Sequence, residues 1–251
     1  MMGYCDLYKG KIAMREEYFQ TIEVNKFLEY VKKYVLFNDV KTIFNIGCRD
    51  HIEISLFSKI FENSQIYAWE GNPECYNDIL EGIKYKKNIT LIQKAAHNYD
   101  GITKFYATDL NKSDLSAGKL DVLGYSSCYK LLNNYTHRIE QKEIKIQCQR
   151  IDSFCDQNGI KEIDLVWMDV EGAAYVVLEG FGDLIRKIKI LRVEVSINPI
   201  REGEIPYPQI NKLLEKNNLF YLDGDLNAPK WTDLVYVNKF ITPLGQSGVS
   251  P

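Results

Sequence analysis

Several features that would assign a function immediately are absent from this chain of 251 residues. No apolar run approaches the roughly 20 residues needed to cross a bilayer, and the N-terminus lacks the continuous apolar core of a signal peptide. The 31 basic and 34 acidic side chains are mixed along the chain and leave a net charge of -3, so no basic surface for nucleic acid is indicated. We therefore expect a cytoplasmic protein without a membrane span or a nucleic-acid partner.

Cysteine and histidine patterns typical of zinc sites or disulfide scaffolds are absent as well. The six cysteines are scattered without a C-x-x-C pair, and none of the three histidines has ligand spacing to another. We expect the cysteines to be free, mostly buried thiols. Because 45% of the residues are apolar, the chain can build one sizeable core, and a single α/β domain is the default expectation.

Short apolar runs alternate with helical stretches along most of the chain, which is typical of βαβ units and a largely parallel, doubly wound sheet. The predicted strands are 42–46, 65–69, 89–94, 165–169 and 188–195. The predicted helices are 52–61, 74–84, 174–187 and 208–216. Two further strand candidates, 219–222 and 234–238, would add a terminal antiparallel hairpin to this Rossmann-like α/β fold.

We predict three segments along the chain. Residues 1–40 form an N-terminal helical extension that packs on the core, since apolar side chains recur at helical spacing between 16 and 37. Residues 41–240 form the main domain, interrupted at about 101–150, where DGITKFYATD resembles a hairpin arm and GYSSCYKLLNNYTHR reads as loop. This insertion is either a lid over the site or a surface excursion. Residues 241–251 are expected to be a flexible tail.

The turn after the first predicted strand suits a nucleotide-like cofactor. In a doubly wound sheet the ligand lies beyond the carboxyl ends of the strands. Gly47 lets the backbone approach the ligand closely, and Glu70, at the end of the next strand, can accept both hydroxyls of an adenosine ribose. The second and third glycines of a dinucleotide fingerprint are missing, which disfavours a nicotinamide dehydrogenase. An ordinary tight turn and a solvated strand end are the simpler alternatives.

Acidic residues gather at the ends of two later strands. Asp169 and Glu171 leave the fourth predicted strand, and Glu194 closes the fifth. Carboxylates at that edge face the crevice, where they can remove a proton from a hydroxyl or, at Asp169 and Glu194, bind an oxygen-preferring cation such as Mg²⁺ or Mn²⁺. Glu171 could instead serve the dipole of the following helix. His137 is an alternative base, unless it is an exposed loop histidine.

A set of ordered motifs runs from residue 42 to residue 238. The most specific is MDVEGAAYVVLEG, and the others are NIGCRD, WEGNPE, GYSSC, QRIDSF, RVEVS and DLVYVN. Together they resemble the FkbM-type S-adenosylmethionine-dependent methyltransferases, whose corresponding pattern is K-I-D-V-E-G-A-E-x-x-V-L-x-G. The chain departs from the family at several positions: Asn45 stands where an acid is usual, His51 replaces a glycine and Ala174 a glutamate.

The resemblance implies a class I methyltransferase fold and O-methylation with S-adenosylmethionine, commonly of a sugar hydroxyl in a glycan, a nucleotide-activated sugar or a secondary metabolite. It also implies that Asp169, Glu171 and Glu194 line the reaction centre. The residues expected to bind the cofactor are Asn45, Gly47, Cys48, Arg49, Asp50, Ser55, Glu70, Gly71, Asn72, Ala96 and Asp169.

We therefore expect a sugar O-methyltransferase of polysaccharide biosynthesis, which can also form a homo-oligomer. The alternatives are a methyltransferase of a small non-sugar metabolite and a methyltransferase-like binding protein without turnover. The insertion and the loop at 198–208 are expected to select the acceptor, with Arg201 holding a nucleotide diphosphate. Ser126 and Ser127 would hydrogen-bond the sugar or the cofactor, or merely fill the insertion's loop.

Overall fold

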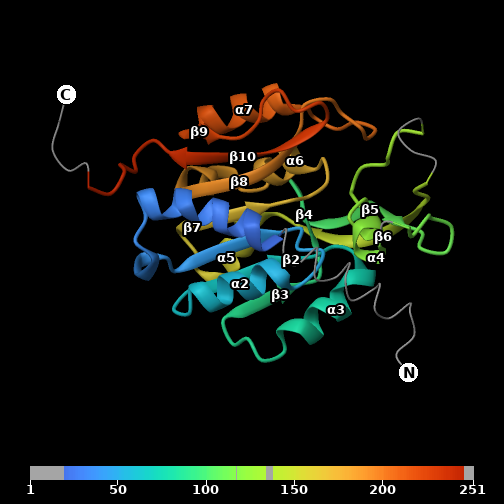
Figure 1. The fold of residues 1–251 in the computed structure, drawn as a ribbon, viewed down its shortest axis with the longest axis horizontal. Helices are drawn as coiled ribbons and strands as arrows, with labels where there is room; N and C mark the ends of the chain where they lie inside the picture. The colour runs from blue at the N-terminus through green and yellow to red at the C-terminus, as the bar shows by residue number, and fades with distance from the viewer. Residues whose placement is uncertain (1–19, 117, 134–137, 246–251) are drawn as a thin grey trace.

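A seven-stranded sheet forms the centre of the computed structural model, which describes residues 20–116, 118–133 and 138–245 (Figure 1). Its strands are β1 (Thr42–Ile46), β2 (Gln65–Trp69), β3 (Ile89–Ile92), β7 (Ile163–Met168), β8 (Ile188–Ser196), β9 (Leu219–Asp223) and β10 (Trp231–Asn238). The order is β3-β2-β1-β7-β8-β10-β9. All neighbouring pairs from β3 to β8 are parallel, whereas β10 runs antiparallel to β8 and β9. The predicted doubly wound sheet with a terminal antiparallel pair is confirmed.

Helices cover both faces of this sheet. They are a helix at 20–34, η1 (Phe37–Asp39), α2 (Ile52–Ile60), α3 (Pro73–Ile83), α4 (Lys119–Leu123), α5 (Ile151–Asn158), α6 (Ala174–Glu179), η2 (Gly182–Lys187) and α7 (Tyr207–Lys216). One core cluster joins the sheet to the helix at 20–34, α2 and α3, and a second joins its other face to α5, α6 and α7. Among the described residues, no helix is long and apolar enough to span a membrane.

Strand β7 shows how the sequence builds both cores. All six of its residues are buried, because a strand covered on both faces is apolar throughout and does not alternate with polar residues. Leu165 and Trp167 point into the core under the helix at 20–34, and Val166 and Met168 point into the opposite core. The chain order reverses between β1 and β7, so the crevice of the doubly wound sheet opens at the carboxyl ends of these two strands.

The helix at 20–34 agrees with the amphipathic pattern of the N-terminal extension. Its buried stripe consists of Val24, Phe27, Leu28 and Val31, and the ring of Phe27 meets that of Trp167 edge-on at 5.5 Å. Gln20 extends the stripe by one turn, and Gln20 and Glu23 lie beside the strand-end residues Gly47 and Asp169 in the lining of one pocket. The extension therefore contributes to the wall of the site as well as to the core.

The insertion contains more regular structure than its sequence pattern predicts. Strand β5 (Gly101–Thr108) pairs along its length with β6 (Gln141–Gln149), and β4 (Ala95–Ala96) completes a separate three-stranded sheet. Figure 1 shows this sheet beside α4, at one end of the central sheet. β5 matches the expected hairpin arm, but β6 lies where the pattern predicts no regular structure. We call residues 101–149 the arm.

Candidate active site

Gly47 brings two strand ends into direct contact. Its φ of +85° is a conformation that residues with a side chain rarely adopt, and a Cβ there would lie 1.8 Å from the carbonyl oxygen of Asp169. On either side, the amide of Gly47 donates to Trp69 O at 2.9 Å, and the amide of Asp169 donates to Ile46 O at 2.9 Å. The glycine is therefore required by close backbone packing at the reversal point of the sheet.

Glu70 closes the loop over this edge. Its two carboxylate oxygens accept from the backbone amides of Arg49 at 2.7 Å and Asn72 at 2.6 Å. Burial raises the pKa of Glu70 to about 7, although these two amides oppose the shift. Each carboxylate oxygen has a second acceptor position, so the residue can still bind ligand hydroxyls. Asn72 in turn caps α3 by accepting from the amide of Glu74 at 3.1 Å.

A cleft of about 930 Å³ opens beside these residues, and we call it the strand-end cleft. Seven of the eleven residues expected to bind the cofactor line it, namely Gly47, Arg49, Glu70, Gly71, Asn72, Ala96 and Asp169.

The other four expected cofactor contacts do not line the cleft. Asn45 is fully buried and donates to Glu53 at 3.4 Å. The thiol of Cys48 is buried and points to Trp69 O, while Asp50 accepts from the amide of Ile52 at the start of α2. Ser55 lies further along that helix. The side chains of Asn45, Cys48 and Asp50 therefore make contacts within the turn and at the start of α2, and none of the four faces the cleft.

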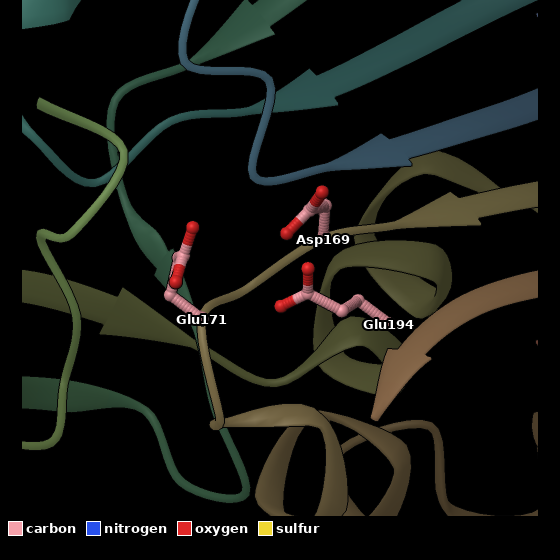
Figure 2. A group of neighbouring side chains, drawn as sticks. All are labelled: Asp169, Glu171 and Glu194. Atoms are coloured by element: carbon pink, nitrogen blue, oxygen red, sulfur yellow. The ribbon is translucent and has the colours of Figure 1, made fainter. Parts of the chain in front are cut away.

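The three acids predicted to line the reaction centre do lie together. Met168, the last residue of β7, pairs with Val193 of β8, so Asp169 and Glu194 follow side by side on the same face. Glu171 approaches from the turn before α6, where its φ is +52°. One carboxylate oxygen of each acid lies within 4.8 Å of the others. Figure 2 shows the three side chains converging from two strand ends and the connecting turn.

Two arginines neutralise two of these acids. Arg192, whose side chain is 5% exposed, lies 3.5 Å from Asp169 and 2.6 Å from Asp233, and stacks 4.2 Å from the centroid of the Trp167 ring. Arg201 is ion-paired to Glu171 and is 3% exposed. It is therefore a buried partner of the acid cluster, which corrects the expectation that it holds a diphosphate.

Glu194 has no ion-pair partner within the described part of the chain. Burial raises its pKa well above the usual value for a glutamate, and the charges of Asp169 and Glu171 raise it further. Burial also raises the pKa of Asp169, against the effect of Arg192, and brings that of Glu171 to about 7, against the effect of Arg201. Three carboxylates so close cannot all ionise cheaply, so the cluster either holds a proton near neutral pH or takes up a cation.

A second hollow, which we call the adjoining pocket, continues from the strand-end cleft. The two share Arg49, Gly124 and Glu171 as lining residues. The other residues that line the adjoining pocket are Asp114, Ser116, Asp121, Val122, Tyr125, Arg138, Ile139, Glu194, Ser196, Ile200, Arg201 and Trp231. They come from the arm, from the end of β8 and the loop that follows it, and from the start of β10. The acid cluster thus lies where the two spaces meet.

The two serines of the GYSSC motif attach the arm to the site. Ser126 Oγ accepts from Asn72 Nδ2 at 3.1 Å, and Ser127 Oγ donates to the backbone carbonyl of Glu171 at 2.7 Å. Both serines also line the strand-end cleft. The arm is therefore anchored to a strand-end loop and to the turn that carries a member of the acid cluster.

The family model described as the methyltransferase FkbM domain matches residues 45–220. The chain belongs to the FkbM methyltransferase family. It is an S-adenosylmethionine-dependent methyltransferase, and its sheet is that of the class I fold. The family match contains the Gly47 turn, Glu70, the arm and all three clustered acids.

Comparison with individual proteins gives more distant similarities. The FkbM-family chain is 26% identical over 176 residues to the 2-O-methyltransferase NoeI of Sinorhizobium fredii, covering 68% of this chain and 70% of NoeI. Aeropyrum pernix fibrillarin, solved with natively bound S-adenosyl-L-methionine, aligns over 81% of this chain and 69% of its own, with 15% identity and a TM-score of 0.47. The N-methyltransferase NodS of Bradyrhizobium japonicum aligns over 90% and 96%, with 10% identity and a TM-score of 0.43.

Several residues at the site of this FkbM-family chain are not indicated by its motifs. Gln20, Glu23 and Glu53 line the strand-end cleft, and Arg192 lies behind the acid cluster. The one available signal is for Gln20, which lies four residues before Val24 and so extends the buried stripe of an otherwise apolar helix face. His137, the alternative base, falls outside the described residues. His51 packs its ring against Gly82 of α3, where a Cβ would lie 2.1 Å away.

Proposed function

We propose that this methyltransferase acts on a hydroxyl group of a sugar, in a nucleotide-activated sugar or a glycan precursor. The observation that carries the proposal is the junction of two spaces at one acid cluster. The strand-end cleft has the features expected for the cofactor, and the adjoining pocket offers room for a second molecule. A hydroxyl placed at the junction would lie beside the carboxylates that can accept its proton.

The strand-end cleft fits S-adenosylmethionine. Gly47 leaves the turn free of a side chain, and Glu70 presents its carboxylate to the cleft, where it can accept from ribose hydroxyls. Ala96 and Asn72 provide small and polar lining beside them. When bound, the cofactor would supply a methyl group attached to a sulfonium sulfur. The sulfur is a good leaving group because it departs as a neutral thioether.

The adjoining pocket suits a polar, hydroxyl-rich acceptor. Asp121 and Ser196 line it and offer hydrogen-bond acceptors and a donor, and Trp231 contributes an aromatic ring that is 42% exposed. An amphipathic ring of this kind can cover an apolar face while polar neighbours bind hydroxyl groups. The distant similarity to NoeI, a 2-O-methyltransferase, supports transfer to oxygen in this chain as well.

The acid cluster can manage the proton released from that hydroxyl. Arg192 favours the charged form of Asp169 and holds it in position, because the guanidinium is buried between Asp169, Asp233 and the Trp167 ring. Glu194, which has a raised pKa and no ion-pair partner among the described residues, can accept that proton once it is itself deprotonated. We assign Glu194 as proton acceptor and Asp169 as the group that orients the hydroxyl.

A divalent cation is the alternative means of activating the hydroxyl. Oxygens of Asp169, Glu171 and Glu194 lie within 4.8 Å of one another, and Mg²⁺ and Mn²⁺ prefer oxygen ligands. Treatment with a chelator followed by addition of either ion separates the two mechanisms. Full activity in the chelator would remove the cation from the proposal.

The direct test is a transfer assay with labelled S-adenosylmethionine against a panel of nucleotide-activated sugars, oligosaccharides and small phenolic or aliphatic alcohols. Label in a sugar product, mapped to an oxygen, is the expected result. Transfer confined to the non-sugar alcohols would replace the acceptor class, and transfer to nitrogen would contradict the assignment of the hydroxyl.

A further inference from the structure

Two side chains that line the strand-end cleft carry an oxygen that accepts no hydrogen bond. Gln20 is 8% exposed, and neither its side-chain oxygen nor one carboxylate oxygen of Asp169 has a partner among the described residues. The side-chain oxygen of Asn45, which is fully buried and outside the lining, has no partner among them either. Leaving a buried acceptor unsatisfied is costly, so the two oxygens at the cleft point to a ligand that donates hydrogen bonds.

Glu53 adds a further carboxylate to the lining of this cleft. It stands in the first turn of α2, lines the cleft together with Gln20 and Asp169, and accepts from the amide of Asn45 at 3.4 Å. The cationic side chains nearby are already paired, Arg49 with Asp50 and Arg192 with Asp169 and Asp233. The unsatisfied oxygens and the additional carboxylate therefore suit a small cation with three donors, which is an ammonium group.

We propose that Glu53 and Gln20 bind the α-ammonium group of S-adenosylmethionine, and that Glu53 supplies the carboxylate that Asn45 lacks. Asn45 acts as a positioning residue, because its side-chain amide donates a hydrogen bond to the Glu53 carboxylate. Gln20 reaches the same place from the N-terminal helix, where its own amide donates to Asp50 at 2.9 Å. This assignment rests on the cofactor alone and does not depend on the acceptor proposed above.

The charges around Glu53 make its ionisation depend on such a ligand. The pKa of Glu53 is raised to about 8, chiefly by burial and also by the carboxylates of Asp50 and Asp169, while Arg192 and Arg49 oppose the shift. Glu23, from the N-terminal helix, also lines the cleft. An ammonium group beside Glu53 would favour its charged form. Binding at pH 7 should then release a proton from Glu53.

The test compares two ligands that share the adenosyl group. S-adenosylhomocysteine carries the amino-acid end, and 5′-methylthioadenosine lacks it. In titration calorimetry, we expect Glu53→Gln and Gln20→Ala each to weaken the binding of S-adenosylhomocysteine at least tenfold. The affinity for methylthioadenosine should change less than twofold. Titrations in buffers of different ionisation enthalpy should show proton release by the wild type and none by Glu53→Gln.

Glu74→Gln is the matched control. Glu74 occupies the first turn of α3, as Glu53 does in α2, but is exposed and outside the cleft, so it reports any general effect of losing an acid at a helix start. It should leave both affinities unchanged. Equal losses for the two ligands in Glu53→Gln and Gln20→Ala, no loss for either ligand, or proton release that persists in Glu53→Gln would each overturn the proposal.

Discussion

Replacing Gly47 by alanine tests the close packing of the strand ends at the site. A residue with a side chain at φ +85° costs about 1–2 kcal/mol. The added Cβ would also lie 1.8 Å from Asp169 O, so β1 and β7 must separate there. That separation weakens the hydrogen bond from Asp169 N to Ile46 O, which contributes about 0.5–1.5 kcal/mol. We expect a total loss of about 1.5–3.5 kcal/mol.

Gly159→Ala provides the matched comparison. Gly159 also has a positive φ, +69°, but nothing lies within 4 Å of the position that its Cβ would take. It should therefore show the conformational cost alone, about 1–2 kcal/mol. At about 2–4 °C per kcal/mol for a chain of this size, the expected decreases in Tm are about 3–14 °C for Gly47→Ala and about 2–8 °C for Gly159→Ala.

Urea denaturation of both variants gives the two free energies of unfolding directly, and their difference isolates the steric part. Binding of S-adenosylhomocysteine should also stabilise Gly47→Ala less than the wild type, for which a ligand at ~100 times its Kd adds about 2.7 kcal/mol. If the two alanine variants lost equal stability, the contact between Gly47 and Asp169 would not be as described.

Three further predictions concern the acids and the arm. Asp169→Asn should reduce methyl transfer at least 100-fold and keep the affinity for S-adenosylhomocysteine within tenfold; normal turnover would refute the role of Asp169. The Glu53 pKa is raised from 4.5 to about 8 in the folded state, so the fold binds more protons and the free energy of unfolding of the wild type should fall relative to Glu53→Gln as pH rises from about 4.5 to 8. Parallel urea curves over this range would contradict that shift. Ser127→Ala removes the hydrogen bond to Glu171 O and should lower kcat more than it changes cofactor affinity; an unaltered kcat in a steady-state assay would show that the attachment is not needed.

The strands of the central sheet were predictable because they are short apolar runs bounded by polar turns. β1 and β2 have the predicted bounds. The predicted helix at 174–187 is divided instead into α6 and η2 near Gly180 and Gly182, the latter with a φ of +53°. A Cβ on Gly180 would lie 2.1 Å from His97 O, a contact that helical periodicity does not reveal.

The acid cluster was predictable for a different reason. Parallel strands end at a common edge, so Asp169 and Glu194 must emerge together. The arginines that neutralise the cluster, and Glu53 and Gln20 in the cleft, were not predictable from motifs. Tertiary packing decides which side chains of distant helices and loops surround a strand end. Nothing in the sequence around Arg192, which lies within the mostly apolar strand β8, marks it as a neighbour of the acid cluster.

The attachment of Ser127 to Glu171 has a consequence for discrimination between acceptors. The arm lines the adjoining pocket, and Ser127 binds the backbone of a residue whose carboxylate belongs to the acid cluster. An acceptor too large for the pocket would push the arm outward, and the attached turn would then move the Glu171 carboxylate away from Asp169 and Glu194. We expect poor acceptors to bind and yet turn over slowly, so that selectivity is expressed in kcat more than in KM.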